Sequence, residues 1–439
     1  MLRPRVDELL RQHDFRLFWT GETVNGAGTA MATIAMPLLA IQILHASTFV
    51  VGLLTACAYL PWLLVSLPAG ALIDRLPSRK VMLTCDVVAS VLYASLAAAT
   101  WLGMVRLDFV LAVACLGGTA NVLFSTGYLV QLPTLVPGER LIEGNVRLQI
   151  SVAIAQLCGP GLSGLAVQVL GAPSALMFNA ASFLVSGYCL LHIRSPDRPP
   201  TYSTAGIRSN IASGMRFVLH DPYLRRIAAW ASLSNLGFGG YEALVVLFLV
   251  QRMHLNSFMV GLLVTGTGGG AVAGALVAKR VVRHLGSARA LLAATMFALP
   301  CALLVLCAAP GPRLIFYVTG IIIAIGGISI ANVIIASFRQ SYAPPAMLGA
   351  ITGTMRFILM GPCPLGALLG GALGARLGVA HALWVMLGTV ALSGTCLLNR
   401  AFTVHRDLPS VRTTCPAPAP APVPACYDRV RKVLTSLTD

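Results

Sequence analysis

Three carboxylate residues lie within long apolar stretches of the chain, where an ionised side chain is costly. They are Glu22, Asp86 and Glu242. A carboxyl group in a low-dielectric environment can bind a proton near neutral pH and release it when its surroundings change. This chemistry suits the exchange of a proton for another solute, so the three acids are the first candidates for function.

Two of these acids belong to polar faces at helical spacing. The faces consist of Glu22, Asn25, Thr29 and Thr33 on the first apolar segment, and of Ser232, Asn235, Gly239 and Glu242 on the seventh. We expect both faces to line one central cavity, completed by side chains of the fourth, tenth and eleventh segments. Those side chains are Asn121, Ser125, Tyr128, Asn332 and Arg356.

The charged candidates also have simpler interpretations. Glu22 lies close to the expected interface, where it can be solvated or paired with Arg16 or Arg356. Arg356 can neutralise a cavity carboxylate, meet an anionic substrate or extend to the cytoplasmic surface. Aromatic side chains that can stack on a lipophilic ligand, or simply pack, are Tyr59, Trp62, Tyr128, Phe238 and Tyr241.

The metal-binding residue types form no recognisable site. The eleven cysteines lie mostly inside apolar segments without a Cys-x-x-Cys pair, and no histidine lies mid-segment near a carboxylate. A membrane-embedded transferase would need an Asp-rich or His/Glu metal motif. We therefore expect no metal, no cofactor and no enzymatic activity.

The composition excludes a soluble protein. Hydrophobic residues make up 57% of the 439 residues and charged residues only 10%, whereas soluble domains carry about 25% charged residues. This excludes a soluble enzyme, a nucleic-acid binder and a disordered scaffold, and it predicts an all-α integral membrane protein.

Gaps between charged residues outline twelve apolar spans, each near the length that crosses a bilayer. If the N-terminus is cytoplasmic, only Arg106, Arg252, Arg313 and Arg376 of the 31 Lys and Arg residues lie at external turns. This positive-inside bias explains the net charge of +16 and predicts a bacterial inner or plasma membrane protein with both termini in the cytoplasm. Residues 1–16 show no signal peptide.

The two parts of the chain are related by an internal repeat. Residues 135–145 align with 342–352 at an offset of 207, and the same offset pairs Gly159 with Gly366. The order of matches is the same in both parts, which predicts a parallel duplication of a six-helix unit.

The repeat and the charge distribution predict five regions. These are a cytoplasmic N-terminus at 1–16, an N-terminal six-helix half at 17–195, a cytoplasmic linker at 196–222, a C-terminal six-helix half at 223–400 and a cytoplasmic Pro/Ala-rich tail at 401–439. Within the linker, Ile211, Met215, Phe217 and Val218 can form one face of a short helix on the membrane surface.

A cluster of charges lies between the second and third spans, in the segment Gly70-Ala71-Leu72-Ile73-Asp74-Arg75-Leu76-Pro77-Ser78-Arg79-Lys80. Such a cluster can latch one conformation and release in another, and Asp86 can pair with Asp74 and Arg79 there. The segment resembles the Gly-x-x-x-Asp-Arg-x-Gly-Arg-Arg/Lys signature of the major facilitator superfamily, with Pro77 and Ser78 in place of Gly-Arg. The predicted latch residues are Gly70, Asp74, Arg75, Arg79, Lys80 and Asp86. The second copy, from Gly274 to Arg283, has Ala278 at the position of Asp74, so the latch is expected on one side only.

The fifth span carries Gly159-Pro160-Gly161-Leu162-Ser163-Gly164. It resembles the Gly-Pro-x-x-Gly-Gly motif of antiporter branches of the superfamily, and Gly159, Pro160 and Gly164 can equally serve tight helix packing. Together with His13-Asp14-Phe15-Arg16-Leu17-Phe18-Trp19, Val136-Pro137-Gly138-Glu139-Arg140-Leu141 and Phe338-Arg339-Gln340, it makes the chain similar to the macrolide-efflux and enterobactin-exporter group of drug:proton antiporters.

This resemblance implies the major facilitator fold, with two parallel six-helix repeats. It also implies a multidrug-resistance type of antiporter, which exports a lipophilic drug, macrolide-like compound or siderophore in exchange for protons by alternating access. The expected partners are a small-molecule substrate, protons and the lipid bilayer, with no nucleic acid, and the protein is expected to be a monomer. The alternatives are proton-coupled uptake of a metabolite and a non-transporting membrane sensor.

Overall fold

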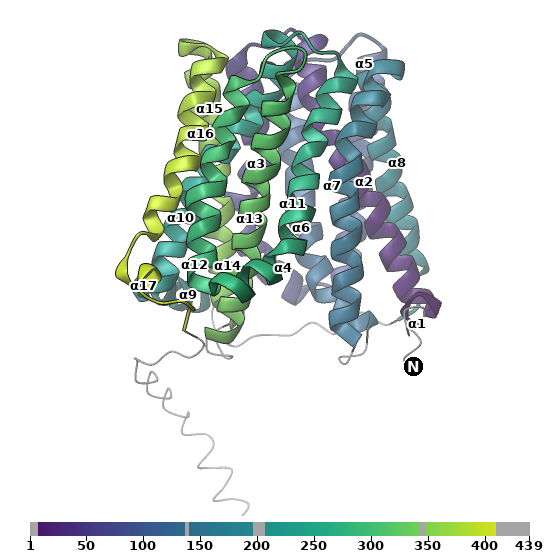
Figure 1. Cartoon of the computed structure of the whole chain (residues 1–439). Helices are drawn as coiled ribbons and strands as arrows, with labels where there is room; N and C mark the ends of the chain where they lie inside the picture. The colour runs from purple at the N-terminus through teal and green to yellow at the C-terminus, as the bar shows by residue number, and fades with distance from the viewer. Residues whose placement is uncertain (1–7, 137–139, 196–206, 343–347, 410–439) are drawn as a thin grey trace, which may run out of the picture.

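The computed structural model describes residues 8–136, 140–195, 207–342 and 348–409. In these ranges every regular element is a helix, and the long helices stand side by side in one bundle (Figure 1). The predicted Pro/Ala-rich tail lies outside the described residues from residue 410 onward. We refer to the end of the bundle near the first residues of α2 as the linker side, and to the other end as the opposite side.

The helices of the first half follow the predicted spans closely. They are α1 (Glu8–Arg11), α2 (His13–Gln42), α3 (Thr48–Leu64), α4 (Ser66–Arg75), α5 (Ser78–Trp101), α6 (Leu107–Leu135), α7 (Leu141–Leu170) and α8 (Ala172–His192). The break between α3 and α4 falls at Val65, four residues after Pro61, a residue type that disfavours a regular helix interior.

The second half begins with α9 (Ile207–His220), α10 (Pro222–Leu247) and the π-helical η2 (Phe248–Arg252). The elements that follow are α11 (Ser257–Leu285), α12 (Ser287–Ala293), η3 (Ala294–Ala298), η4 (Leu299–Cys307), α13 (Leu314–Tyr342), α14 (Leu348–Met360), α15 (Pro362–Leu377), α16 (Val379–Ser393), η6 (Gly394–Leu397) and α17 (Arg400–Thr403). The π-helical η3 ends just before the 3₁₀-helical η4, whose second residue is Pro300, a residue that lacks a backbone donor and interrupts a regular α-helix.

Within the described residues, eleven helices are long and apolar enough to cross a membrane. The predicted second span corresponds to α3, which has 17 residues and is a shorter apolar helix. The all-helical membrane architecture is therefore confirmed, with eleven full-length spans and this shorter helix in place of twelve equal ones.

The parallel duplication is confirmed by helix packing. In the first half α2 packs against α7 and α8, and in the second half α10 packs against α15 and α16. The pair α3 and α6 likewise corresponds to α11 and α13. The turns that follow the equivalent helices also share a backbone conformation. His45 and His254 lie in these turns and have positive φ angles of 47° and 55°.

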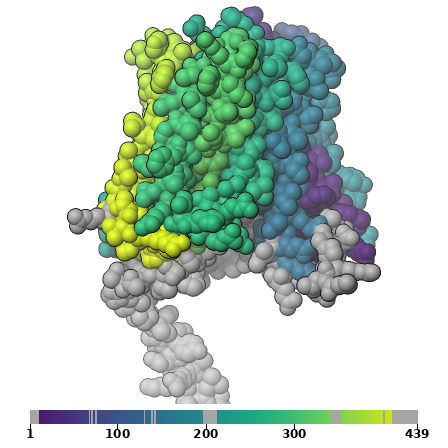
Figure 2. All heavy atoms as spheres, in the orientation of Figure 1, coloured from purple at the N-terminus to yellow at the C-terminus, as the bar shows by residue number. Residues whose placement is uncertain are grey.

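The halves meet along two equivalent seams, α3 with α15 and α7 with α11. In the space-filling view the second half, in green and yellow, borders α7, in blue (Figure 2). Glycines allow this close approach: a Cβ atom on Gly371 would lie 2.9 Å from the Gly52 Cα atom, and one on Gly164 would lie 3.0 Å from the Gly261 Cα atom.

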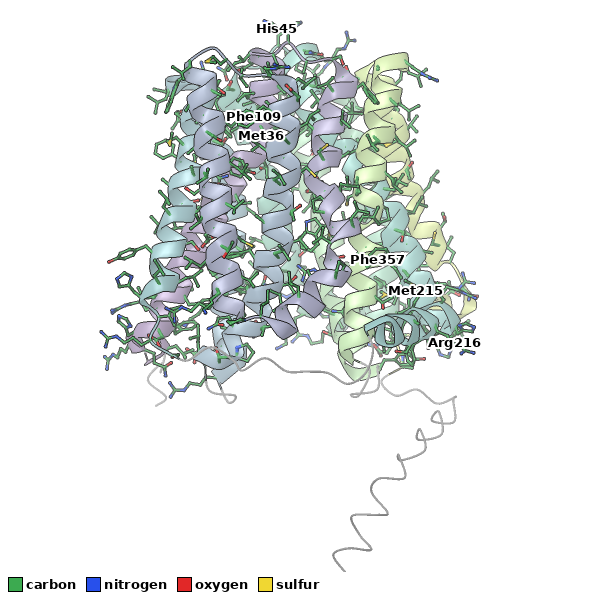
Figure 3. The ribbon with its side chains drawn as sticks, turned by 180° about the vertical axis from the view of Figure 1, so that it is seen from behind. Met36, His45, Phe109, Met215, Arg216 and Phe357 are labelled. Atoms are coloured by element: carbon green, nitrogen blue, oxygen red, sulfur yellow. The ribbon has the colours of Figure 1, made fainter. Side chains whose placement is uncertain are left out.

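The apolar core is shared at one end of the bundle and divided at the other. On the opposite side, one cluster joins residues of both halves, including Met36 of α2 and Leu244 of α10. Figure 3 shows Met36 near Phe109 at this end. On the linker side each half has a separate cluster, with Phe15 in the first half and Ile227 in the second.

The linker helix makes contacts with the bundle that its sequence did not predict. The helix itself is present as α9, but it packs against α14 and α10. Val218 is fully buried in the core of the second half, and Met215 of α9 lies at the same end of the bundle as Phe357 of α14 (Figure 3). Burial against the protein satisfies the apolar face that the sequence pattern assigned to the bilayer.

Candidate functional site

Two groups of polar residues surround the predicted acids. The first, which we call the N-terminal acidic centre, consists of Glu22, Asn25 and Thr29 on α2 and of Asp86 on α5. Asn25 Nδ2 donates to Asp86 Oδ1 at 3.3 Å, and Thr29 Oγ1 donates to Asn25 Oδ1 at 3.2 Å. The chain of hydrogen bonds therefore links the polar face of α2 to an acid of another helix in the same half.

The surroundings of Asp86 are closed to solvent. Its side chain is 1% exposed, and the Ser186 hydroxyl of α8 lies beside the carboxyl group. Glu22 is close enough for the two carboxyl groups to repel each other electrostatically, and Tyr128 of α6 lies next to Glu22. The Tyr128 ring stacks on Phe18 with centroids 5.5 Å apart.

The second group, the C-terminal acidic centre, lies at the boundary between the halves. Glu242 of α10 lies near the Tyr59 hydroxyl, which belongs to α3 of the first half. Cys363 of α15 is also near Glu242, and its thiol contacts the Asn235 side chain at 3.8 Å. Glu242 therefore faces a group on the other half, unlike Asp86.

Arg356 forms a second contact across the boundary. Its guanidinium carbon lies 4.7 Å from the centre of the Trp62 ring, so α14 is joined to α3 by a cation–π interaction. Nearby, a Cβ atom on Gly361 would lie 3.0 Å from Leu63. The structure thus gives Arg356 an aromatic neighbour, which was not among the three roles expected from the sequence.

Three predicted cavity residues are not joined to either centre. Asn121 of α6 and Asn332 of α13 are exposed, and Ser125 donates to the Val122 carbonyl oxygen of its own helix at 3.0 Å. Helical spacing predicts a shared face but not what that face meets, because the neighbouring helix determines the contacts.

The predicted latch is described only in part. The side chains of Gly70, Asp74 and Arg75 lie outside the described part of the structure. Lys80 is exposed, and Arg79 donates from Nε to the Leu190 carbonyl oxygen at 2.6 Å. Asp86 was expected in this latch but lies in the N-terminal acidic centre instead, because the inward face of α5 carries it toward α2 and α8.

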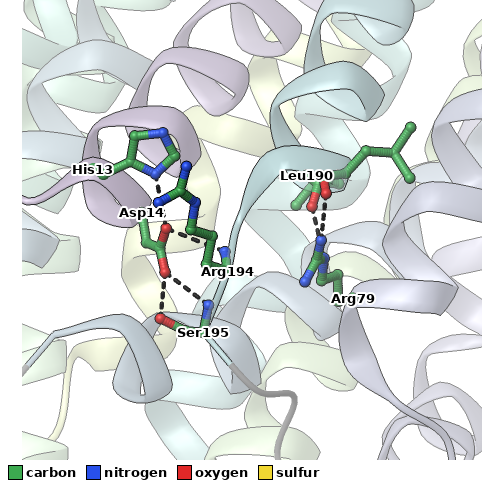
Figure 4. Close-up of polar contacts among 7 residues, drawn as sticks. His13, Asp14, Arg79, Leu190, Arg194 and Ser195 are labelled. Carbon is green, nitrogen blue, oxygen red and sulfur yellow. Dashed lines mark hydrogen bonds and ion pairs between the residues drawn. The ribbon is translucent and has the colours of Figure 1, made fainter.

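The last turn of α8 is held from two sides, as Figure 4 shows. Arg79 contacts Leu190 and also donates to the Leu191 carbonyl oxygen at 2.7 Å, which satisfies carbonyl groups that a helix end leaves free. Asp14 at the start of α2 accepts from the Ser195 backbone nitrogen at 2.8 Å. These contacts fix the linker-side end of the first half.

The glycine motif of α7 lies where two interfaces meet. A Cβ atom on Gly159 would be 2.5 Å from the Ala30 side chain of α2, within the first half. Pro160 and Gly164 face Gly261 of α11, across the seam. The motif residues therefore serve close packing both inside the first half and between the halves.

Some contacts were not anticipated from the sequence. Gln42 at the end of α2 donates to the Ser257 hydroxyl of α11 at 3.0 Å, which ties the halves on the opposite side. Ser186 and Tyr59 acquire their contacts with the acids from the packing of α8 and α3. Tyr59 was expected from the sequence only as an aromatic surface, and Ser186 was not singled out. In the described ranges, no three His, Cys, Asp or Glu residues lie together as a metal site would require.

The fold and its two polar helices define a multi-pass membrane protein built from two repeats. The sequence profile of the Major Facilitator Superfamily matches residues 18–362. The chain therefore belongs to the major facilitator superfamily, a class of transporters rather than enzymes.

Relatives of known or assigned function include exporters. The chain is 26% identical to the multidrug efflux pump Tap of Mycolicibacterium fortuitum, over 82% of this chain and 89% of Tap. It is 25% identical to the enterobactin exporter EntS of Citrobacter koseri, over 84% of this chain and 87% of EntS. An uncharacterized MFS-type transporter of Sinorhizobium fredii, y4rN, is 27% identical over 78% of this chain and 81% of its own length.

Solved structures share the fold at low sequence identity. The nucleoside transporter NupG has a TM-score of 0.70 at 11% identity, and the match covers 89% of this chain and 98% of NupG. A bacterial homologue of the iron transporter ferroportin, in an inward-facing state, has a TM-score of 0.71 at 18% identity, and the match covers 89% of this chain and 98% of that homologue. The molecule is thus a membrane transporter for a small solute.

Proposed function

We propose that this transporter exports a lipophilic small molecule, such as a drug, a macrolide-like compound or a siderophore, in exchange for protons. The observation that carries the proposal is the division of the apolar core, which is shared on the opposite side and separate on the linker side. Two halves packed together at one end can rock about their contacts and open a site between them to either side in turn.

The C-terminal acidic centre is suited to couple this motion to a proton. Glu242 lies beside Tyr59 of the other half, so its environment changes whenever the halves move relative to each other. A carboxyl group whose surroundings alternate between wet and dry can take up a proton in one state and lose it in the other. Each inward proton supplies about 2.3 kcal/mol per 100 mV of membrane potential.

Several features support export across a bacterial inner membrane. The linker side carries most of the Lys and Arg residues, and the positive-inside rule favours a cytoplasmic location for this side. The similar proteins Tap and EntS are, by name, an efflux pump and an exporter. Aromatic rings at the boundary, among them Tyr59 and Trp62, offer surfaces on which a lipophilic substrate can stack.

The test uses inside-out membrane vesicles that are energised to build a proton gradient and report it through a pH-sensitive dye. Macrolides, lipophilic cations and catecholate siderophores are added in turn. A substrate of a proton-coupled exporter should restore the dye signal, and Glu242→Gln should abolish that recovery. The matched control is Glu143→Gln, since Glu143 is paired with Arg147 at 3.3 Å on α7, away from both centres.

The outcomes separate the proposal from its alternatives. Recovery with one compound, lost in Glu242→Gln and kept in Glu143→Gln, supports proton-coupled export of that class. No recovery with any compound, in vesicles that contain folded protein, would exclude proton-coupled export of the compounds tested. The remaining possibilities would then be uptake of a metabolite, uniport or a sensor.

A further inference from the structure

We propose that Gln42 and Ser257 form a one-sided clasp, which holds the opposite side of the transporter closed and must open during transport. The proposal rests on the proposed function only in that opening of the opposite side would release the exported compound. It assigns control of this opening to two residues at one of the two seams between the halves, the α7–α11 seam.

The clasp joins the end of one helix to the start of another across the boundary. Gln42 is the last residue of α2 in the first half, and Ser257 is the first residue of α11 in the second half. Gln42 Nε2 donates to Ser257 Oγ at 3.0 Å, and Ser257 is only 5% exposed. Because the two residues belong to different halves, this hydrogen bond cannot persist when the halves separate at this end.

Close backbone packing surrounds the clasp. A Cβ atom on Gly164 of α7 would collide with the Ser257 carbonyl oxygen, and one on Gly261 would lie 2.9 Å from the Gly164 Cα atom. Ser257 therefore lies at a closed end of the α7–α11 seam, where little water reaches its side chain. A buried hydroxyl group needs a hydrogen-bond partner within the protein, and Gln42 supplies one.

The internal repeat provides an equivalent pair of residues at the other seam. Residues 41–52 align with residues 250–261 at an offset of 209, which pairs Gln42 with Gln251 and Thr48 with Ser257. If the halves were symmetric, Gln251 would donate to Thr48 across the α3–α15 seam. Gln42 and Gln251 are both exposed, but within the described residues the Gln251 side chain makes no hydrogen bond. The clasp therefore exists at the α7–α11 seam and has no counterpart in this second pair.

The asymmetry has a cause in the length and shape of the helix that carries Gln251. The interval from Asp14 to His45 is 31 residues, whereas the interval between their counterparts Asp221 and His254 is 33 residues. In the first half α2 ends as an α-helix, but in the second half α10 continues into the π-helical η2, which contains Gln251. A π-helical turn bonds each residue to the fifth along the chain rather than the fourth, so it takes up extra length and redirects the side chains.

The two seams are therefore unequal at the opposite side. At the α3–α15 seam the halves meet through the close approach of Gly52 and Gly371. The α7–α11 seam has the same kind of glycine contact and, in addition, the Gln42–Ser257 hydrogen bond. One neutral hydrogen bond changes an equilibrium about two- to tenfold. The clasp thus favours the form that is closed at the opposite side, and its loss shifts the population toward the open form.

The test measures the opening of the opposite side directly and needs no substrate. Spin labels are attached at the positions of Met104 and Arg313, which are exposed in opposite-side turns of the first and second halves. A non-natural ketone amino acid carries each label, so the native cysteines stay unlabelled. Pulsed electron paramagnetic resonance of the full-length protein in lipid nanodiscs then gives the fraction of molecules with a long distance. Gln42→Ala should raise this open fraction about two- to tenfold.

The repeat supplies a matched control. Gln251→Ala removes the same side chain at the equivalent position and should leave the distance distribution unchanged. Ser257→Ala should act like Gln42→Ala, whereas Ser257→Thr keeps the hydroxyl group and should retain the wild-type distribution. A wild-type distribution in both Gln42→Ala and Ser257→Ala would overturn the proposal. An equal shift in Gln251→Ala would overturn it as well, because the effect would then not depend on the clasp.

The experiment separates this proposal from proton-coupled export. The distances depend only on the closed and open forms, so they test the clasp even when no compound moves protons in vesicles. Conversely, substrate-driven dye recovery together with wild-type distances in Gln42→Ala would support export and overturn the clasp.

Discussion

The repeat-related helices α2 and α10 carry the two acidic centres, yet they place them differently. Asn25 of α2 binds Asp86 inside the first half, in a site closed by α5 and α8. Glu242 of α10 instead meets Tyr59 of the other half. A duplicated unit thus supplies one centre inside one half and one at the boundary between the halves. We expect changes in the first to alter stability, and changes at the boundary to alter the conformational equilibrium.

The largest effect is expected at the seams. In Gly371→Val, the new side chain would begin 2.9 Å from the Gly52 Cα atom, so α3 and α15 could no longer approach on the opposite side. Transport should fall to background while the purified protein remains folded. Gly388→Val on α16 is the control, because a Cβ atom there has no neighbour within 4 Å. If Gly371→Val transported at the wild-type rate, the close approach of α3 and α15 would not be required for transport.

Inside the first half, Asn25→Ala should lower the free energy of unfolding by about 1–3 kcal/mol, because it leaves the buried Asp86 without its donor. The measurement is chemical denaturation in detergent, compared with Asn121→Ala in the same half. Asn121 is exposed, so its substitution should change stability by less than about 0.5 kcal/mol. Equal losses in the free energy of unfolding for both variants would show that the Asn25–Asp86 hydrogen bond does not itself stabilise the fold.

At the boundary, Tyr59→Phe keeps the ring and removes the hydroxyl group that faces Glu242. One hydrogen bond contributes about 0.5–1.5 kcal/mol, which corresponds to roughly a two- to tenfold slower transport rate. Thermal stability should stay unchanged, since each half keeps its own core. Tyr188→Phe serves as the control because Tyr188 is exposed on α8. A drop in thermal stability without a change in transport rate would show that the Tyr59 hydroxyl group stabilises the fold and does not affect the conformational equilibrium.

The smallest effect is expected for Arg356→Lys. Lysine keeps the charge but stacks less well on Trp62, so about 0.5–1 kcal/mol of the contact should be lost. The expected result is roughly a two- to fivefold change in transport, measured beside Arg376→Lys at the exposed end of α15. A much larger loss would indicate that Arg356 meets the substrate or a carboxylate in another state of the transport cycle.

Much of the fold was predictable because a membrane-spanning helix requires a long apolar segment. Long charge-free segments, the offset of 207 and the motif around Asp74 indicated the helical fold, the duplication and the family. Each depends on composition or on order along the chain, and an apolar segment of sufficient length has few alternatives to a membrane helix. The acids themselves were also found, since ionisable residues are rare in such segments.

What the acids contact was decided only by the tertiary structure. Helical spacing placed Glu22, Asn25 and Thr29 on one face. Because α8 packs against both α2 and α5, Asp86 reaches Asn25 on that face rather than the latch. The same limit applies to α9, whose apolar face suited a membrane surface and α14 equally well. Periodicity determines which side of a helix is buried or polar, whereas the partner of that side depends on how distant segments cross.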